Sequence, residues 1–74
     1  MKAMAAIRNI MAQKGIRVTT MAYQLGIKQN VLSQRFTQEN VSVSKLNEMA
    51  RLLDYKVVLV PRSTRLPDGG YDLE

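Results

Sequence analysis

The sequence has 74 residues, which is enough for one small domain and too short for a second. Hydrophobic residues make up 46% of it and charged residues 23%, a balance typical of a globular protein and not of a disordered one. It contains no cysteine and no histidine, which excludes disulfides, thiolate or imidazole metal sites and imidazole catalysis.

The charges are unevenly distributed along the chain. Residues 1–65 carry all eleven basic residues and three acidic ones, a net charge of +8, whereas residues 66–74 carry three acidic residues and no basic one. This favours an anionic partner, with nucleic acid as the first candidate, although such a charge also serves solubility. Arg8 and Asn9 interrupt the apolar start, and no run approaches the roughly 18 apolar residues of a membrane span, so we expect a cytoplasmic protein.

The first predicted helix spans residues 2–14. Its apolar residues are spaced three and four apart and form one face, namely Met4, Ile7 and Met11. Gly15 follows the last turn, where a left-handed residue ends a helix, and Lys14 suits the negative end of the helix dipole. Lys2 and Arg8 lie on the outer side of this helix, and we expect them to be solvated.

The second predicted helix is short, covering residues 20–25. Thr19 or Thr20 can cap it, and Gly26 ends it after two turns. Its inner side carries Met21, Ala22 and Leu25.

The third predicted helix begins at Lys28 and ends at Phe36 or Thr37. One side is formed by Val31, Leu32, Arg35 and Phe36. The other side is polar and has no carboxylate, and it is formed by Gln29, Asn30, Ser33, Gln34 and Thr37. Ala22 would lie where this helix crosses the previous one, since a larger side chain there would push the two apart.

Residues 37–40 read as a loop, and a fourth helix is predicted over residues 43–54. Ser42 is placed as its N-cap. Val41 before the cap and Leu46 in the next turn match a hydrophobic staple.

The segment 56–60 predicts a short strand because it contains Val57, Val58, Leu59 and Val60, and Pro61 ends it. The chain offers this strand no partner, so we expect it to pair antiparallel with the same strand of a second subunit in a homodimer. The alternatives are a strand lying over the core of a monomer, or a dimer formed through helix faces. Residues 61–74 are expected to be a flexible tail.

Two short helices joined by a turn with one glycine are typical of a helix-turn-helix. The spacing Ala22-x3-Gly26-x5-Leu32 within the segment 20–34 resembles that of the Cro/cI-type repressors of phages and bacteria. The resemblance runs from about residue 3 to residue 54 and is closest to a small branch found in bacteria and their mobile elements, which has a similar loop 37–43 and closing strand 55–61. The family often has an apolar residue where Arg35 stands, and here Phe36 takes the inward place.

The resemblance implies a mainly α, λ-repressor-like domain over residues 1–60, made of four helices and the C-terminal strand. The third helix would then enter the major groove of DNA. The residues that match the base-reading positions, or can reach the bases beside them, are Lys28, Gln29, Asn30, Ser33 and Gln34. Amide side chains can bond adenine and lysine can bond guanine, while Val31 could touch a thymine methyl. The alternative is that this face is simply solvated.

Phosphate contacts would supply most of the affinity. The candidates before the second helix are Arg17, Thr19 and Thr20, and those around the loop after the third helix are Arg35, Gln38, Asn40, Ser42 and Lys45. For Thr20 and Ser42, capping is the competing role. Arg62 and Arg65 are either a basic arm on DNA or part of a solvated tail.

The sequence therefore predicts a sequence-specific regulator that binds double-stranded DNA, acting as a dimeric repressor on a palindromic operator. The competing hypothesis is a protein-interaction module of a mobile element (an antitoxin, antirepressor or inhibitor) that uses the same fold. An enzyme is not expected, because the sequence offers no nucleophile–base pair, no carboxylate cluster and no ligand set, and we expect no metal or cofactor.

Overall fold

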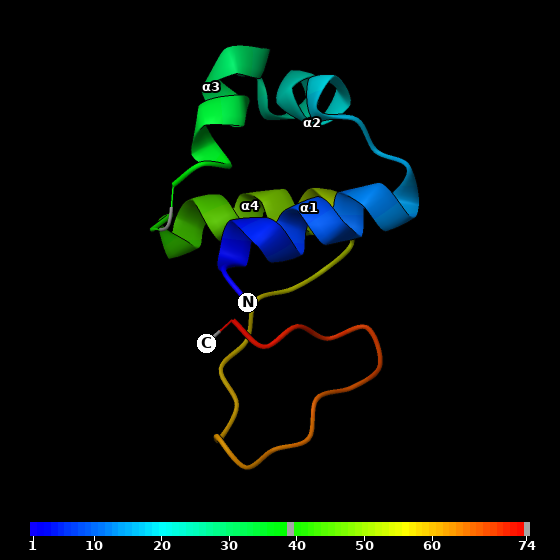
Figure 1. The fold of residues 1–74 in the computed structure, drawn as a ribbon, viewed down its shortest axis with the longest axis vertical. Coiled ribbons are helices and arrows are strands. Elements are labelled where there is room, and N and C mark those ends of the chain that lie inside the picture. The colour runs from blue at the N-terminus through cyan, green and yellow to red at the C-terminus, as the bar shows by residue number, and fades with distance from the viewer. Residues whose placement is uncertain (39, 74) are drawn as a thin grey trace.

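The computed structural model describes residues 1–38 and 40–73; Glu39 of the predicted loop and Glu74 of the predicted tail lie outside the described residues. Four helices follow one another: α1 (Ala3–Lys14), α2 (Val18–Leu25), α3 (Gln29–Arg35) and α4 (Val43–Leu52). α1 and α4 pack against each other in the middle of the molecule (Figure 1). α2 and α3 lie at one end of its 39 Å long axis, and the C-terminal segment lies at the other (Figure 1).

One hydrophobic core joins the four helices. It is formed by the buried residues Met4, Ile7, Ile10, Met11, Met21, Ala22, Leu32, Leu46, Met49, Ala50 and Leu53. The predicted apolar faces are therefore confirmed at most positions. Methionines fill much of this core, because their flexible side chains adapt to the irregular space between short helices.

Glycines end the first two helices as predicted. Gly15 has a φ of 67° and Gly26 a φ of 70°, both in the left-handed region. After each glycine the next residue donates a backbone hydrogen bond back into the helix, from Ile16 to Met11 at 2.9 Å and from Ile27 to Ala22 at 3.0 Å. These bonds satisfy carbonyl groups that the helix end would otherwise leave unpaired.

The predicted start of the second helix was wrong. α2 begins at Val18, and Arg17 is its N-cap without a side-chain hydrogen bond to the helix. Thr19 and Thr20 consequently lie inside the first turn and cap nothing. The reason is tertiary: Val18 packs against the core, and this contact extends the helix toward the N-terminus.

The third helix is shorter than predicted, because Lys28 is its N-cap and Phe36 its C-cap. Phe36 packs against the core, which confirms its inward place. Val31 was predicted on the same inner side but is 43% exposed. In a helix of two turns, Leu32 alone is fully buried on this side, and Val31 lies at the edge of the interface.

The fourth helix begins as predicted and ends two residues early. Ser42 is its N-cap, and Val41 packs against the core that contains Leu46, as the predicted staple requires. After Leu53 the chain turns at Asp54, whose φ of 61° is left-handed. The Tyr55 amide then donates to the Ala50 carbonyl at 2.8 Å, which closes the helix end.

The predicted strand 56–60 does not form within the chain, and no described residue belongs to a strand. Val57 packs against the core, but Val58, Leu59 and Val60 are exposed, Leu59 completely so at 102%. A strand needs a neighbour to share its backbone hydrogen bonds, and the described part of the chain supplies none.

The segment after Pro61 turns back toward the helices (Figure 1). Turns are closed by backbone hydrogen bonds from Thr64 to Pro61 at 2.9 Å and from Gly70 to Pro67 at 3.0 Å. The segment ends with the Tyr71 ring 6.5 Å from the Tyr55 ring. Beside it, the amino group of Met1 donates to the Asp72 carbonyl at 3.1 Å. Both ends of the C-terminal loop are thus held beside α1 and α4, while the flexibility of the tail stays a prediction.

The left-handed turn at Gly26 predicts a specific stability pattern. A Cβ at this position would meet no atom within 4 Å, so the penalty of Gly26→Ala comes from the backbone conformation alone. We expect Gly26→Ala to lower the free energy of unfolding by about 1 kcal/mol in urea denaturation. Gly26→Asn should lose less, because asparagine tolerates the left-handed region. An alanine variant as stable as the original would contradict this explanation.

Candidate nucleic-acid interface

The position of α3 is set by its packing on α2. Ala22 is 2% exposed and Leu32 is fully buried, so the two helices meet closely at small and medium-sized side chains. Leu25 and Ile27 pack against the same core from the turn region. This packing places α3 at an outer end of the molecule (Figure 1).

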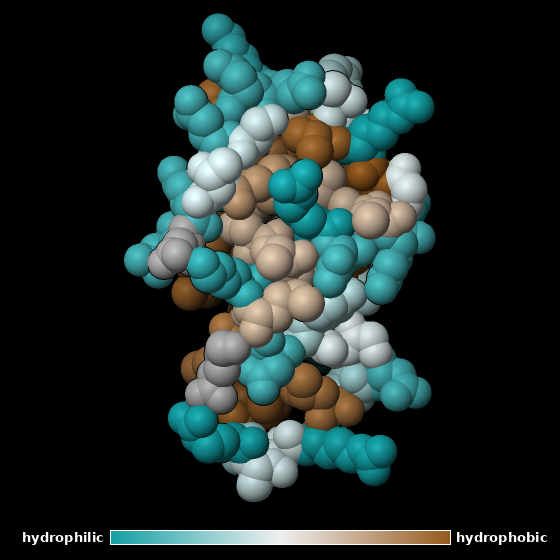
Figure 2. Space-filling view, viewed as in Figure 1, coloured by the Kyte–Doolittle hydropathy of each residue, from teal (hydrophilic) through white to brown (hydrophobic). Residues whose placement is uncertain are grey.

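All predicted base-contacting residues lie on the exposed surface of α3 and its N-cap. They are Lys28, Gln29, Asn30, Ser33 and Gln34. Residues 28–38 contain no carboxylate, and the surface is polar at the end where α2 and α3 lie (Figure 2). An exposed helix that offers amides, a hydroxyl and an ammonium group can both donate hydrogen bonds to base edges and accept them.

The predicted phosphate-contacting residues fall into two groups. Arg17, Thr19 and Thr20 are exposed at the start of α2, whereas Gln38, Asn40 and Lys45 are exposed around the loop after α3. Figure 1 shows the start of α2 and the loop after α3 on opposite sides of the molecule. Arg35, at the end of α3, is half-buried. This arrangement is consistent with α3 in a DNA groove and phosphate-contacting residues on either side of it. The role of each residue stays a prediction.

Ser42 has an identified structural role. Its Oγ accepts a hydrogen bond from the Lys45 backbone amide at 3.2 Å, so it caps α4. This confirms the capping role that the sequence predicted for Ser42. Thr20 has no such role, since α2 starts before it.

Arg62 and Arg65 do not join either group. They lie in the C-terminal loop, at the opposite end of the long axis from α3 (Figure 1). In this structure the two arginines therefore do not form a basic arm beside α3 of the same protomer.

Sequence reasoning missed Arg8, which was expected to be merely solvated. Its guanidinium lies over the ring of Phe36, 5.3 Å from the ring centroid. The two residues are far apart in sequence and belong to α1 and to the end of α3, so no local pattern signals their contact. The fold therefore brings a cation of α1 to the end of α3.

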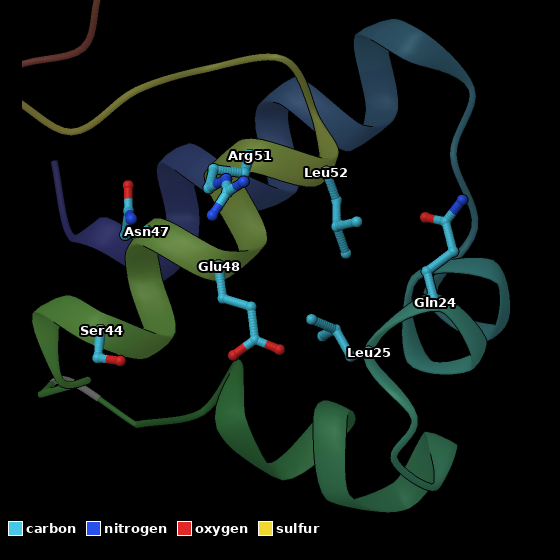
Figure 3. A pocket seen from close by; sticks show the side chains of 7 residues that line it. All are labelled: Gln24, Leu25, Ser44, Asn47, Glu48, Arg51 and Leu52. Atoms are coloured by element: carbon cyan, nitrogen blue, oxygen red, sulfur yellow. The ribbon is translucent and has the colours of Figure 1, made fainter.

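A surface hollow lies between α2 and α4, with a volume of about 570 Å³. Gln24 and Leu25 of α2 face Ser44, Asn47, Glu48, Arg51 and Leu52 of α4 (Figure 3). Leu25 and Leu52 point toward one another, and Glu48 is the one carboxylate of the lining (Figure 3). Across residues 1–38 and 40–73, no group of three acidic side chains gathers as metal ligands. The helices of the same ranges are too short or too polar to cross a membrane.

Comparison with known proteins identifies the helical part of the chain. The family model of the Cro/C1-type HTH DNA-binding domain matches residues 6–57, which include most of α1 and all of α2, α3 and α4. No curated protein and no solved structure matches the chain. The predicted resemblance to Cro/cI-type proteins is thus confirmed, while the mobile-element branch and the closing strand find no support.

The cap of α4 gives a testable prediction about the stability of the fold. We expect Ser42→Ala to lower the free energy of unfolding by about 1 kcal/mol, because the Lys45 amide loses its acceptor. Ser44→Ala, two residues further along the same helix and also exposed, is the matched control and should change stability little. Urea denaturation followed by circular dichroism measures both, and equal stability of the two variants would argue against the cap.

Proposed function

The chain belongs to the family of Cro/C1-type helix-turn-helix DNA-binding domains, and from this premise we propose that it is a sequence-specific regulator of transcription. It binds double-stranded DNA with α3 in the major groove. The observation that carries the proposal is the exposed, carboxylate-free face of α3, a helix that packs on α2 with Ala22 and Leu32 buried in the shared core.

Base recognition follows from the chemistry of the α3 surface. Gln29, Asn30 and Gln34 each offer an amide that can donate to N7 and accept from N6 of adenine, in a bidentate pair. Lys28 can donate to guanine O6 and N7, and Ser33 to either purine. Each good bidentate contact discriminates between bases by about 1–3 kcal/mol, so two or three of them are enough for a specific site.

Affinity comes from the backbone of the DNA. The two exposed groups beside α3, Arg17 with Thr19 and Thr20 on one side and Gln38, Asn40 and Lys45 on the other, are the proposed phosphate contacts. The net charge of +8 over residues 1–65 would attract the duplex. Half-buried Arg35 is proposed as a further phosphate contact at the end of α3.

The active form is proposed to be a homodimer. Support comes from Val58, Leu59 and Val60, which expose apolar side chains on a segment that pairs with no strand among the described residues. Hydrophobic atoms are visible at this end of the molecule, opposite α2 and α3 (Figure 2). We infer that Val57–Val60 pairs with the same segment of a second copy, because shared backbone hydrogen bonds would satisfy both.

The geometry restricts the symmetry of this dimer. α3 and the segment 57–60 lie at opposite ends of the long axis. Both copies of α3 reach one duplex only if the two-fold axis runs roughly along that long axis. The two helices would then sit about 34 Å apart, one turn of DNA, on a palindromic operator.

A repressor is the simplest regulator of this kind, since an occupied operator excludes other proteins without further contacts. We propose that it acts in the cytoplasm as a binding protein and not as an enzyme, without a cofactor. The exposed apolar segment also suits a different protein as partner, and the dimer experiment below separates the two.

Readout by α3 is tested with duplexes selected from a random pool. We expect a palindromic consensus, and we expect Gln29→Ala or Gln34→Ala to weaken binding to it by about 5- to 150-fold, the equivalent of one lost bidentate contact. Binding to an unrelated duplex should stay unchanged. Gln13→Ala is the matched control, because Gln13 is an exposed residue of α1, away from α3. If no duplex is enriched in the selection, the proposal fails.

Dimerisation is tested by light scattering of the full chain. Leu59→Asp should convert a dimer into a monomer. Leu59 is fully exposed in the single chain and would be buried between the two copies, so the substitution would place an unpaired carboxylate in the dimer interface. Val43→Asp is the control, since Val43 is also exposed, at 71%, but lies on α4. A chain that is monomeric before substitution would overturn the dimer and favour a different protein partner at this segment.

A further inference from the structure

Phe36 holds Arg8 in a fixed place beside the end of α3. The ring is half-buried and packs against the hydrophobic core, so its position is determined by the fold. The Arg8 guanidinium lies 5.3 Å from the centroid of this ring, within the range of about 6 Å in which a cation is attracted by an aromatic face. The ring thereby holds the Arg8 side chain of α1 beside the end of α3.

An aromatic ring positions an arginine without neutralising it. A carboxylate in the same place would occupy the N–H donors and cancel the charge, whereas an aromatic ring attracts the cation without accepting conventional hydrogen bonds from its donors or neutralising it. Within the described part of the chain, Arg8 forms no ion pair. Its positive charge is therefore available, in a planar fork that suits a phosphate oxygen pair.

The surroundings of Arg8 favour an anion. A hollow of about 270 Å³ opens beside it, lined by Lys2, Met4, Ala5, Arg8, Phe36, Thr37 and Gln38. Among the described residues of this lining, two are cations and none is acidic. Gln38, a predicted phosphate contact, belongs to the loop after α3, and the hollow joins this loop to the start of α1.

We propose that this hollow is a phosphate site and that Arg8 contacts a backbone phosphate of double-stranded DNA. The inference rests on the proposed function and extends the phosphate-contacting surface from the loop after α3 onto α1. Phe36 is a positioning residue in this site, because it touches the guanidinium and not the DNA. A phosphate bound at this site would fix the distance between the end of α3 and the DNA backbone, and so the depth of α3 in the major groove.

Arg8→Gln tests the contact in the full chain. The probe is a random-sequence duplex, and its affinity is measured by fluorescence anisotropy over a series of salt concentrations. Losing one phosphate contact should reduce the slope of log affinity against log salt by about 0.9 and weaken binding about fivefold at 0.15 M salt. Arg65→Gln removes the same charge at the far end of the molecule and should leave the slope unchanged.

Thermal unfolding of the same variants separates binding from packing. A lower melting temperature of Arg8→Gln with an unchanged salt slope would overturn the proposal and leave Arg8 as a packing residue. If the wild-type protein does not bind the duplex at all, the proposed function is overturned as well. An unchanged slope in Arg8→Gln, with strong binding by the original chain, would overturn only the phosphate site.

Phe36→Leu tests the positioning role, since leucine keeps an apolar contact with the core and removes the ring face. We expect the effect of Arg8→Gln on affinity to fall from about fivefold to less than twofold when Phe36 is already leucine. Equal effects of Arg8→Gln with and without the ring would show that Phe36 does not position the guanidinium.

Discussion

The close packing of α3 on α2 is the contact on which the rest of the molecule depends. Ala22 and Leu32 are both buried in it, and the left-handed Gly26 makes the turn between the helices short enough for them to meet. Because Leu32 is the one fully buried side chain of α3, almost all the other side chains of this helix remain on the surface. A helix of two turns gains its rigidity from its neighbour and can therefore offer most of its circumference to a ligand.

The two ends of the long axis carry different surfaces. The end with α2 and α3 is polar and free of carboxylates on residues 28–38, which suits an anionic polymer. The opposite end exposes Val58, Leu59 and Val60, which suits a protein surface. Between them lies a small core rich in methionine. The two proposed contacts, one with DNA and one with a second copy, therefore lie on separate surfaces and would not compete.

Two aromatic contacts join segments that are far apart in the sequence. The Arg8 guanidinium of α1 lies over the ring of Phe36 after α3, and Tyr71 near the C-terminus lies close to Tyr55 after α4. In each case an aromatic ring provides a fixed surface for a segment that has little else to hold it. The first pair keeps a cation beside the proposed DNA surface, and the second brings the C-terminal segment back to the helices.

Local sequence determined the number of helices, their glycine and serine boundaries and the polar face of α3. These features depend on side chains within a few residues of one another, such as Ser42 and the Lys45 amide, or Gly26 and its own φ. The tertiary structure alone decided the rest. Packing of Val18 moved the start of α2, the edge of the interface exposed Val31, and the lack of a neighbouring strand left residues 56–60 irregular. The Arg8 contact with Phe36 also arose only from the fold, because it joins residues whose separation along the chain hides their proximity in space.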